Sequence, residues 1–153
     1  MSQLGMGKIS EGVLVSVAFP SAQIGAATIY YNGKSITTGL GIGFNAENFD
    51  DCLLSINVGV VQGAVATVIN TVMESDTDDP TAATAVALAT FSMRAVSATA
   101  VQETGRIQCK DTKKYLFLKT ETQGAPLTVQ FGANWIGGTP RSQPTAQTLV
   151  FDV

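Results

Sequence analysis

The stretch CLLSINVGVV, residues 52–61, decides the fold class of this chain. Apolar side chains occupy every second position, and in an extended strand they share one face: Leu54, Ile56, Val58 and Val60. The opposite face carries small or polar residues: Ser55, Asn57 and Gly59. Alternation with a period of two, rich in β-branched residues, predicts a strand rather than a helix.

Similar apolar runs flank this stretch on both sides, and each predicts a further strand. They cover residues 13–19, 64–75, 113–122, 127–138 and 148–153. In residues 113–122, Tyr115 and Phe117 face one way and Leu116 and Leu118 the other, which predicts a strand buried on both faces or paired with a partner on one. Asn32-Gly33, between two β-prone runs, predicts a tight hairpin.

Three other segments give less direct predictions of secondary structure. The Ala-rich stretch 81–96 fits either a helix or a strand, and both stay open. The alternating glycines of residues 40–44 predict a flexible connector or an edge strand. GLGIG, residues 39–43, resembles part of a phosphate-binding loop but lacks its full spacing and its lysine. Pro140 and Pro144 are expected to bracket a loop before the final strand.

Seven to nine short strands separated by Gly and Pro turns predict an all-β protein. At 153 residues the chain fits one domain, residues 1–153. We therefore expect a single jelly-roll-like β-sandwich with an N-terminal arm or hairpin, in which residues 1–20 form an arm or a swapped strand.

Composition narrows the function classes. The net charge of −3 argues against nucleic acid as the main partner, since such binders neutralise many phosphates. Histidine is absent, which removes Ser-His-Asp and Cys-His catalysis, so we expect no enzyme. No apolar run reaches the ~20 residues of a membrane-spanning helix, so we expect no membrane partner.

The two cysteines, Cys52 and Cys109, lie far apart in the sequence and form no CxxC motif. This spacing excludes a sequence-local zinc site and a thioredoxin-type motif. A disulfide between them stays open, but two free thiols in the interior are the favoured reading, because cysteine often behaves as a small buried hydrophobe.

The acidic stretch ESDTDDP, residues 74–80, is the strongest candidate for metal chemistry. Asp76 and Asp78 alternate as calcium ligands do, but the glycine and the terminal glutamate of an EF-hand loop are missing. A solvated turn that Pro80 ends is therefore favoured over a calcium site, and no cofactor is predicted.

Two further features could bind a partner. Five of the nine basic residues lie between Arg106 and Lys119, and among them Lys113 and Lys114 could present a basic patch, although a solvated strand face is the plainer reading. Trp135 could stack on a sugar, although a lone tryptophan belongs more often to a core or an interface.

Taken in order, four segments resemble small head proteins of tailed bacteriophages that act as capsid cement or decoration proteins. The segments are FDDCLLSINVG (49–59), TVMESDTDD (71–79), KDTKKYLFLKTE (110–121) and FGANWIGGTPRSQP (131–144). In this family the third segment carries a basic pair before a tyrosine, here Lys113-Lys114-Tyr115. The fourth ends in a Gly-x-Pro-Arg stretch, here residues 138–141. The resemblance covers residues 40–144.

The resemblance implies a jelly-roll-like structural protein on the exterior of a virion, made in the host cytoplasm. Its partners would be the major capsid protein and further copies of itself, as a homodimer or homotrimer. The residues expected at partner contacts are Lys113, Lys114, Trp135 and Arg141.

Two alternatives remain. One is a neck or tail-decoration protein with the same β character. The other is a carbohydrate-binding β-sandwich, which Trp135 and the acidic loop would favour.

Overall fold

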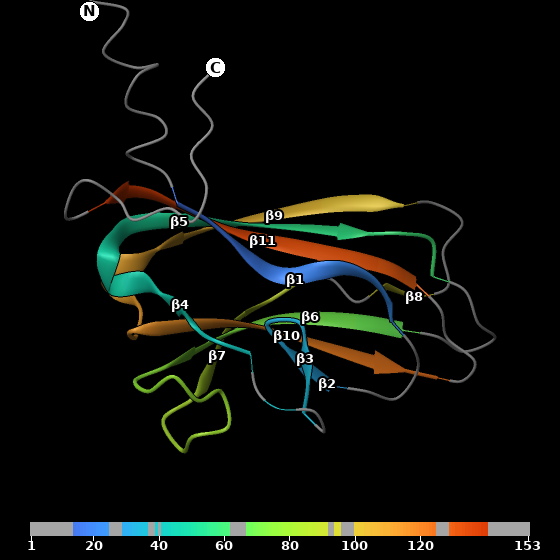
Figure 1. Ribbon diagram of the computed structural model, residues 1–153, viewed down its shortest axis with the longest axis horizontal. Coiled ribbons are helices and arrows are strands. Elements are labelled where there is room, and N and C mark those ends of the chain that lie inside the picture. Colours follow the sequence, from blue (N-terminus) through green and yellow to red (C-terminus); the bar gives the residue numbers. More distant parts are fainter. Residues whose placement is uncertain are drawn as a thin grey trace, which may run out of the picture.

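The protein is a two-layer β-sandwich in the computed structural model (Figure 1). The structure describes residues 14–24, 29–36, 39, 41–61, 67–91, 94–95, 100–124 and 129–140. These residues form eleven strands and two short 3-10 turns, Ala46–Asn48 and Cys109–Asp111. The predicted all-β sandwich is confirmed, while the jelly-roll connectivity stays a prediction.

The first sheet has four antiparallel strands in the order β1-β11-β5-β9. The strands are β1 (Leu14–Ile24), β11 (Val129–Pro140), β5 (Phe49–Val58) and β9 (Val101–Gln108). β1 is an edge strand that contains Pro20 and two irregularities in its register against β11. Proline and bulges are common on edge strands, because an edge N–H need not enter a ladder.

The second sheet runs β3-β2-β10-β6-β7, with two short strands added beside this path. Its strands are β2 (Ile29–Tyr31), β3 (Lys34–Ser35), β6 (Thr67–Ser75), β7 (Val86–Thr90) and β10 (Tyr115–Gln123). β4 (Phe44–Asn45) pairs with β10, and β8 (Arg94–Ala95) pairs with β6.

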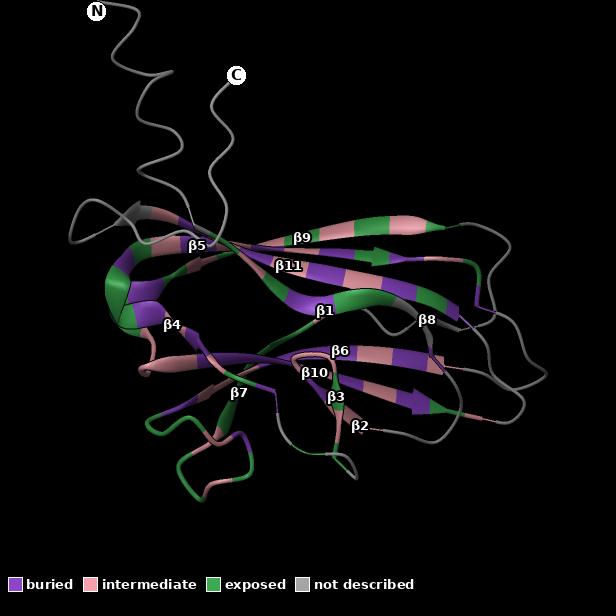
Figure 2. Ribbon diagram, in the orientation of Figure 1, coloured by how far each residue is buried: buried purple, intermediate pink, exposed green. Residues whose placement is uncertain are grey.

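The core lies between the two sheets, where alternate residues of the long strands meet. Figure 2 shows this alternation as buried bands along β5, β10 and β11. The largest fully buried side chains of this core are Trp135, Phe49, Phe131, Leu54, Ile56, Leu116 and Leu118. Burying a Leu, Ile or Phe side chain stabilises a fold by about 1.5–3 kcal/mol, so this layer holds the sheets together.

Asn32 joins the two sheets through its side chain. With Gly33 it forms the predicted hairpin turn between β2 and β3, and both residues have positive φ. Its Oδ1 accepts hydrogen bonds from the Leu118 backbone N–H at 2.8 Å and from the Trp135 indole N–H at 3.3 Å. Its own N–H donates to the Leu118 carbonyl. Asn32 therefore completes the hydrogen bonding of β10 between its pairings with β4 and β2.

Several predicted details differ in the structure. β5 ends at Val58, so the alternation stops there: Val60 is exposed, contrary to its predicted face, and Val61 is buried instead. Pro140 is the last residue of β11 rather than part of a loop. Within residues 81–96, the described part contains β7 and β8, which decides against a helix.

The chain ends fall partly outside the described residues. Residues 14–20, predicted as part of an arm or swapped strand, lie in β1 and pair with β11 of the same chain. Residues 1–13, the strand predicted at 148–153 and Pro144 lie outside the described residues.

Candidate functional site

The acidic stretch is a hydrogen-bonded loop between β6 and β7. Asp76, Thr77 and Asp78 are exposed, as a solvated turn requires, but Ser75 and Pro80 are buried. Asp79 Oδ1 accepts hydrogen bonds from the backbone N–H of Thr81 at 2.8 Å and from its hydroxyl at 2.7 Å. The hydrogen bond from the Thr81 hydroxyl lowers the pKa of Asp79 most, and the bond from the Thr81 backbone N–H lowers it further.

The two calcium candidates are engaged with different partners. Asp76 pairs with Lys113 Nζ at 3.3 Å, whereas Asp78 Oδ1 accepts a hydrogen bond from the Gly43 backbone N–H at 2.6 Å. In the described residues, no three acidic or cysteine side chains come together as a metal site. The arrangement gives the two carboxylates structural roles.

Asp78 fixes the glycine segment over the outer side of β10. Phe117 is fully buried on that side, away from the core between the sheets. A Cβ on Gly43 would lie 2.7 Å from the Phe117 ring, and one on Gly41 would lie 2.3 Å from the Tyr31 carbonyl oxygen. Gly41 and Gly43 are therefore needed for close packing, and residues 41–43 form no strand.

The basic pair also serves the fold. Lys113 Nζ donates to the Thr84 carbonyl as well as pairing with Asp76, and its backbone N–H donates to Glu74 Oε2 at 2.9 Å. Lys114 pairs with Glu47 at 3.4 Å and lies over the Tyr115 ring. The hydrogen bond and charge of Glu47 raise the pKa of Lys114. Each lysine thus ties β10 to a neighbouring loop.

Trp135 is not available to a partner. Its side chain is 1% exposed and stacks on Phe44 with ring centroids 5.5 Å apart. The prediction of a sugar or partner contact at this residue is therefore wrong, and its core reading holds. Arg141 lies outside the described residues.

Cys52 and Cys109 are both buried free thiols, as favoured from the sequence. A hydrogen bond between the two side chains, together with burial, raises the pKa of the Cys52 thiol. A protonated, buried thiol is a poor nucleophile, so the pair belongs to the packing of β5 against the Cys109–Asp111 turn.

The outer face of the first sheet carries the most distinctive exposed surface. Val15 and Val17 on β1 are 61% and 60% exposed. Val15 lies directly opposite Ile136 of β11, and Ile136 lies directly opposite Leu53 of β5. Ile136 and Leu53 are half-buried. We call Val15, Val17, Leu53 and Ile136 the apolar patch.

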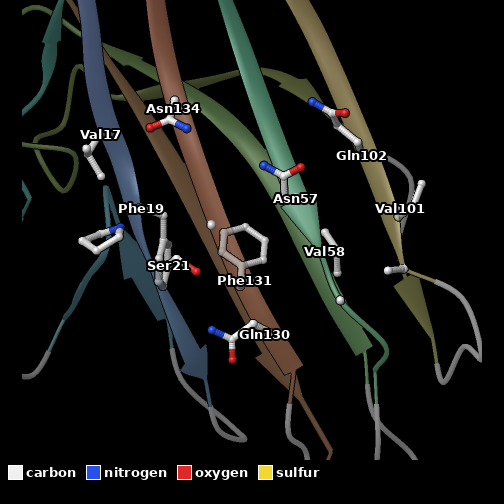
Figure 3. Close-up of a pocket in the computed structure, with 14 residues that line it drawn as sticks. Val17, Phe19, Ser21, Asn57, Val58, Val101, Gln102, Gln130, Phe131 and Asn134 are labelled. Atoms are coloured by element: carbon white, nitrogen blue, oxygen red, sulfur yellow. The ribbon is translucent and has the colours of Figure 1, made fainter.

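Next to the apolar patch, the same face is hollowed into a groove of about 800 Å³. Figure 3 shows that its lining comes from four adjacent strands, with Asn134, Asn57 and Gln102 on β11, β5 and β9. Gly132 and Gly59 mark close approach of the backbone at this end of the sheet: a Cβ on Gly59 would lie 3.0 Å from the Gln130 carbonyl oxygen. The groove also reaches Val17, Ser21 and Gln130.

Sequence reasoning did not identify this groove. The signal was present in part, because Asn57 and Gly59 were assigned to the face of β5 opposite the core. The groove forms because Asn57 lies beside Gly132 and Gln102. These neighbours are set by strand order and register, which bring together residues that are far apart in the chain.

Comparisons of this chain with protein families, curated proteins and solved structures find no match. Among the described residues, no helix has the length and apolar character needed to cross a bilayer.

Proposed function

We propose that this protein is a structural component of a tailed-bacteriophage virion, which binds the outer surface of the capsid as a cement or decoration protein. The apolar patch on the outer face of the first sheet carries the proposal. Two valines exposed by 60% or more, beside Ile136 and Leu53, form a contiguous apolar surface on a rigid sheet. Surfaces of this kind mark contacts between proteins.

The ordered resemblance of residues 40–144 to head-decoration proteins supports the same function. Of the residues in its motifs, Trp135 is buried, while Lys113 and Lys114 are partly exposed and already paired with Asp76 and Glu47. We therefore assign the capsid contact to the apolar patch instead of to these residues.

The mechanism is stabilisation by mass action. A protein that binds the assembled capsid, but not free subunits, shifts the equilibrium toward the assembly. A specific contact of this kind buries about 1,000 Å² or more in total. Because Val15 lies on edge strand β1, a neighbouring chain could also pair with the strand beside it.

Electron microscopy and quantitative mass spectrometry of the parent virion test the proposal. We expect the protein on the head exterior, in a copy number proportional to that of the major capsid protein. A few copies located at the neck or tail would favour the alternative virion role, and absence from the virion would refute both.

The surface assignment has its own test. Heads lacking the protein are mixed with Val15→Ser/Val17→Ser, and binding is measured by co-sedimentation. We expect affinity to fall roughly tenfold, because two apolar contacts are lost. Val86→Ser is the matched control, since Val86 is also exposed but lies on β7 of the other sheet. Equal loss in both variants would contradict the assignment.

A further inference from the structure

The groove beside the apolar patch has a mainly apolar lining, in which a few uncharged hydrogen-bonding groups are set. The side chains of Asn57, Gln102, Gln130 and Asn134 line it, together with Ser21. Asn57, Gln102 and Gln130 are exposed, and Asn134 is half-buried. Each amide has two N–H donors and an oxygen acceptor, so the set can both donate and accept.

The register places two of these amides directly opposite each other. Asn57 of β5 pairs with Gln102 of β9 on one side and with Gly132 of β11 on the other. Directly opposite residues have Cβ atoms about 4.5–5.5 Å apart. The Gln102 amide is already oriented, because its Nε2 donates to Ser55 Oγ at 3.2 Å.

The lining contains no charged residue. Arg106 and Asp51, which lie farther along this face, are bound to each other at 2.7 Å. A charged ligand would therefore lose hydration in the groove without gaining an ion pair. This favours a neutral ligand.

The position of the groove also disfavours an extended peptide. A peptide that adds to a sheet pairs with an open edge, but β11 and β5, which form the middle of the groove, are hydrogen-bonded on both sides. A ligand here meets side-chain amides and a hydroxyl rather than free backbone groups. We propose that the groove binds a neutral carbohydrate, whose hydroxyls both donate and accept hydrogen bonds as the amides do.

This inference does not depend on the proposed capsid role. It also differs from a sugar site at Trp135, which is buried. The aromatic residues that line the groove, Phe19 and Phe131, are buried on the core side, so binding relies on hydrogen bonds rather than ring stacking. We expect a weak site with a dissociation constant on the order of 1 mM.

The test is an NMR titration of the full chain labelled with ¹⁵N. The probes are maltotriose, cellotriose and tri-N-acetylchitotriose, with sialyllactose as a charged comparison, each up to about 10 mM. We expect at least one neutral probe to shift the side-chain amide signals of Asn57 and Gln102 in a saturable manner.

Two variants locate the site. Gln102→Ala should weaken binding about three- to tenfold, the effect of one or two lost hydrogen bonds. Gln108→Ala should leave it unchanged, because Gln108 is exposed on the same strand outside the groove. Asn57→Ala should weaken binding by a similar factor, because Asn57 is exposed and lies directly opposite Gln102 in the groove.

Three outcomes would overturn the inference. They are the absence of shifts with every neutral probe, an affinity unchanged in both Gln102→Ala and Asn57→Ala, and tighter binding of sialyllactose than of the neutral sugars. Amide spectra of each variant without ligand show whether it is folded. Because no capsid is present, failure here leaves the proposed virion role untouched.

Discussion

At the scale of single residues, Asn32 does more than form a hairpin turn: its side chain also links the two sheets. Its sequence signal, Asn-Gly between β-prone runs, predicted the turn correctly. The same pattern contains nothing about Leu118 or Trp135, which lie 86 and 103 positions away in the chain. Leu118 and Trp135 both reach the side-chain amide of Asn32 only because the two sheets are stacked on each other.

Asn32→Ala should lower the free energy of unfolding by about 2–4 kcal/mol, because it leaves buried donors without acceptors. Asn32→Gly tolerates the positive φ of this position but also lacks the amide, so we expect a loss of similar size. Urea denaturation measures both. A glycine variant as stable as the wild type would show that the hydrogen bonds of Asn32 are not the source of the effect.

The buried thiols make stability depend on alkaline pH. The folded pKa of Cys52 is raised above the unfolded value of 9.0. Above pH 9 the unfolded chain therefore loses a proton that the folded chain retains, and the free energy of unfolding falls as pH rises. We expect a slope of about 1 kcal/mol per pH unit between roughly pH 9 and 10.

Urea denaturation across this pH range measures the slope. The slope should flatten in Cys52→Ala, whatever the absolute stability of that variant. A wild-type stability that is constant over the same range would contradict this assignment. The raised pKa of Lys114 acts in the same direction, but only above its usual value of 10.5.

At the scale of elements, periodicity predicted most of the long strands but missed β9, whose eight residues alternate between half-buried and exposed without a run of apolar side chains. β5, β6, β10 and β11 coincide with alternating or β-branched runs in the sequence. β7 was undecided, because its five residues are all exposed and therefore show no apolar alternation. Loop packing was also missed, since the glycines of residues 41–43 face residues that are distant in sequence.

The loop between β6 and β7 gives different roles to Asp76 and Asp78, two carboxylates that look alike in the sequence. Asp78→Ala should cost about 1–2 kcal/mol, because it frees the Gly43 segment that covers Phe117. Asp76→Ala should cost under about 0.5 kcal/mol, as for other exposed ion pairs. Asp78→Asn keeps an acceptor oxygen and should resemble the wild type.

Chemical denaturation of the three variants provides the comparison, with Asp76→Ala as the matched control. An Asp78→Ala variant as stable as Asp76→Ala would show that the loop does not hold the segment. Added calcium should leave the melting temperature of the wild type unchanged, because Asp76 and Asp78 are engaged with separate partners.

At the scale of the whole molecule, Trp135 reports on both sheets. It belongs to β11 of one sheet, stacks on Phe44 of the other and donates to Asn32. As the single tryptophan of the chain, it supplies a fluorescence signal from the shared core. We expect its urea transition to coincide with that of the far-UV circular dichroism. Separate midpoints would show that the sheets unfold independently.

The strand order also has a consequence for the nascent chain. β11 lies between β1 and β5, yet among the described strands it is the last to leave the ribosome. Until then β1 lacks the only neighbour it has in the described sheet, and its exposed valines have no adjacent strand. A chain interrupted before residue 129 therefore cannot assemble the first sheet, and its bare strand edges invite aggregation or binding by a chaperone. The central place of β11 makes synthesis through residue 140 a condition for folding this half of the molecule.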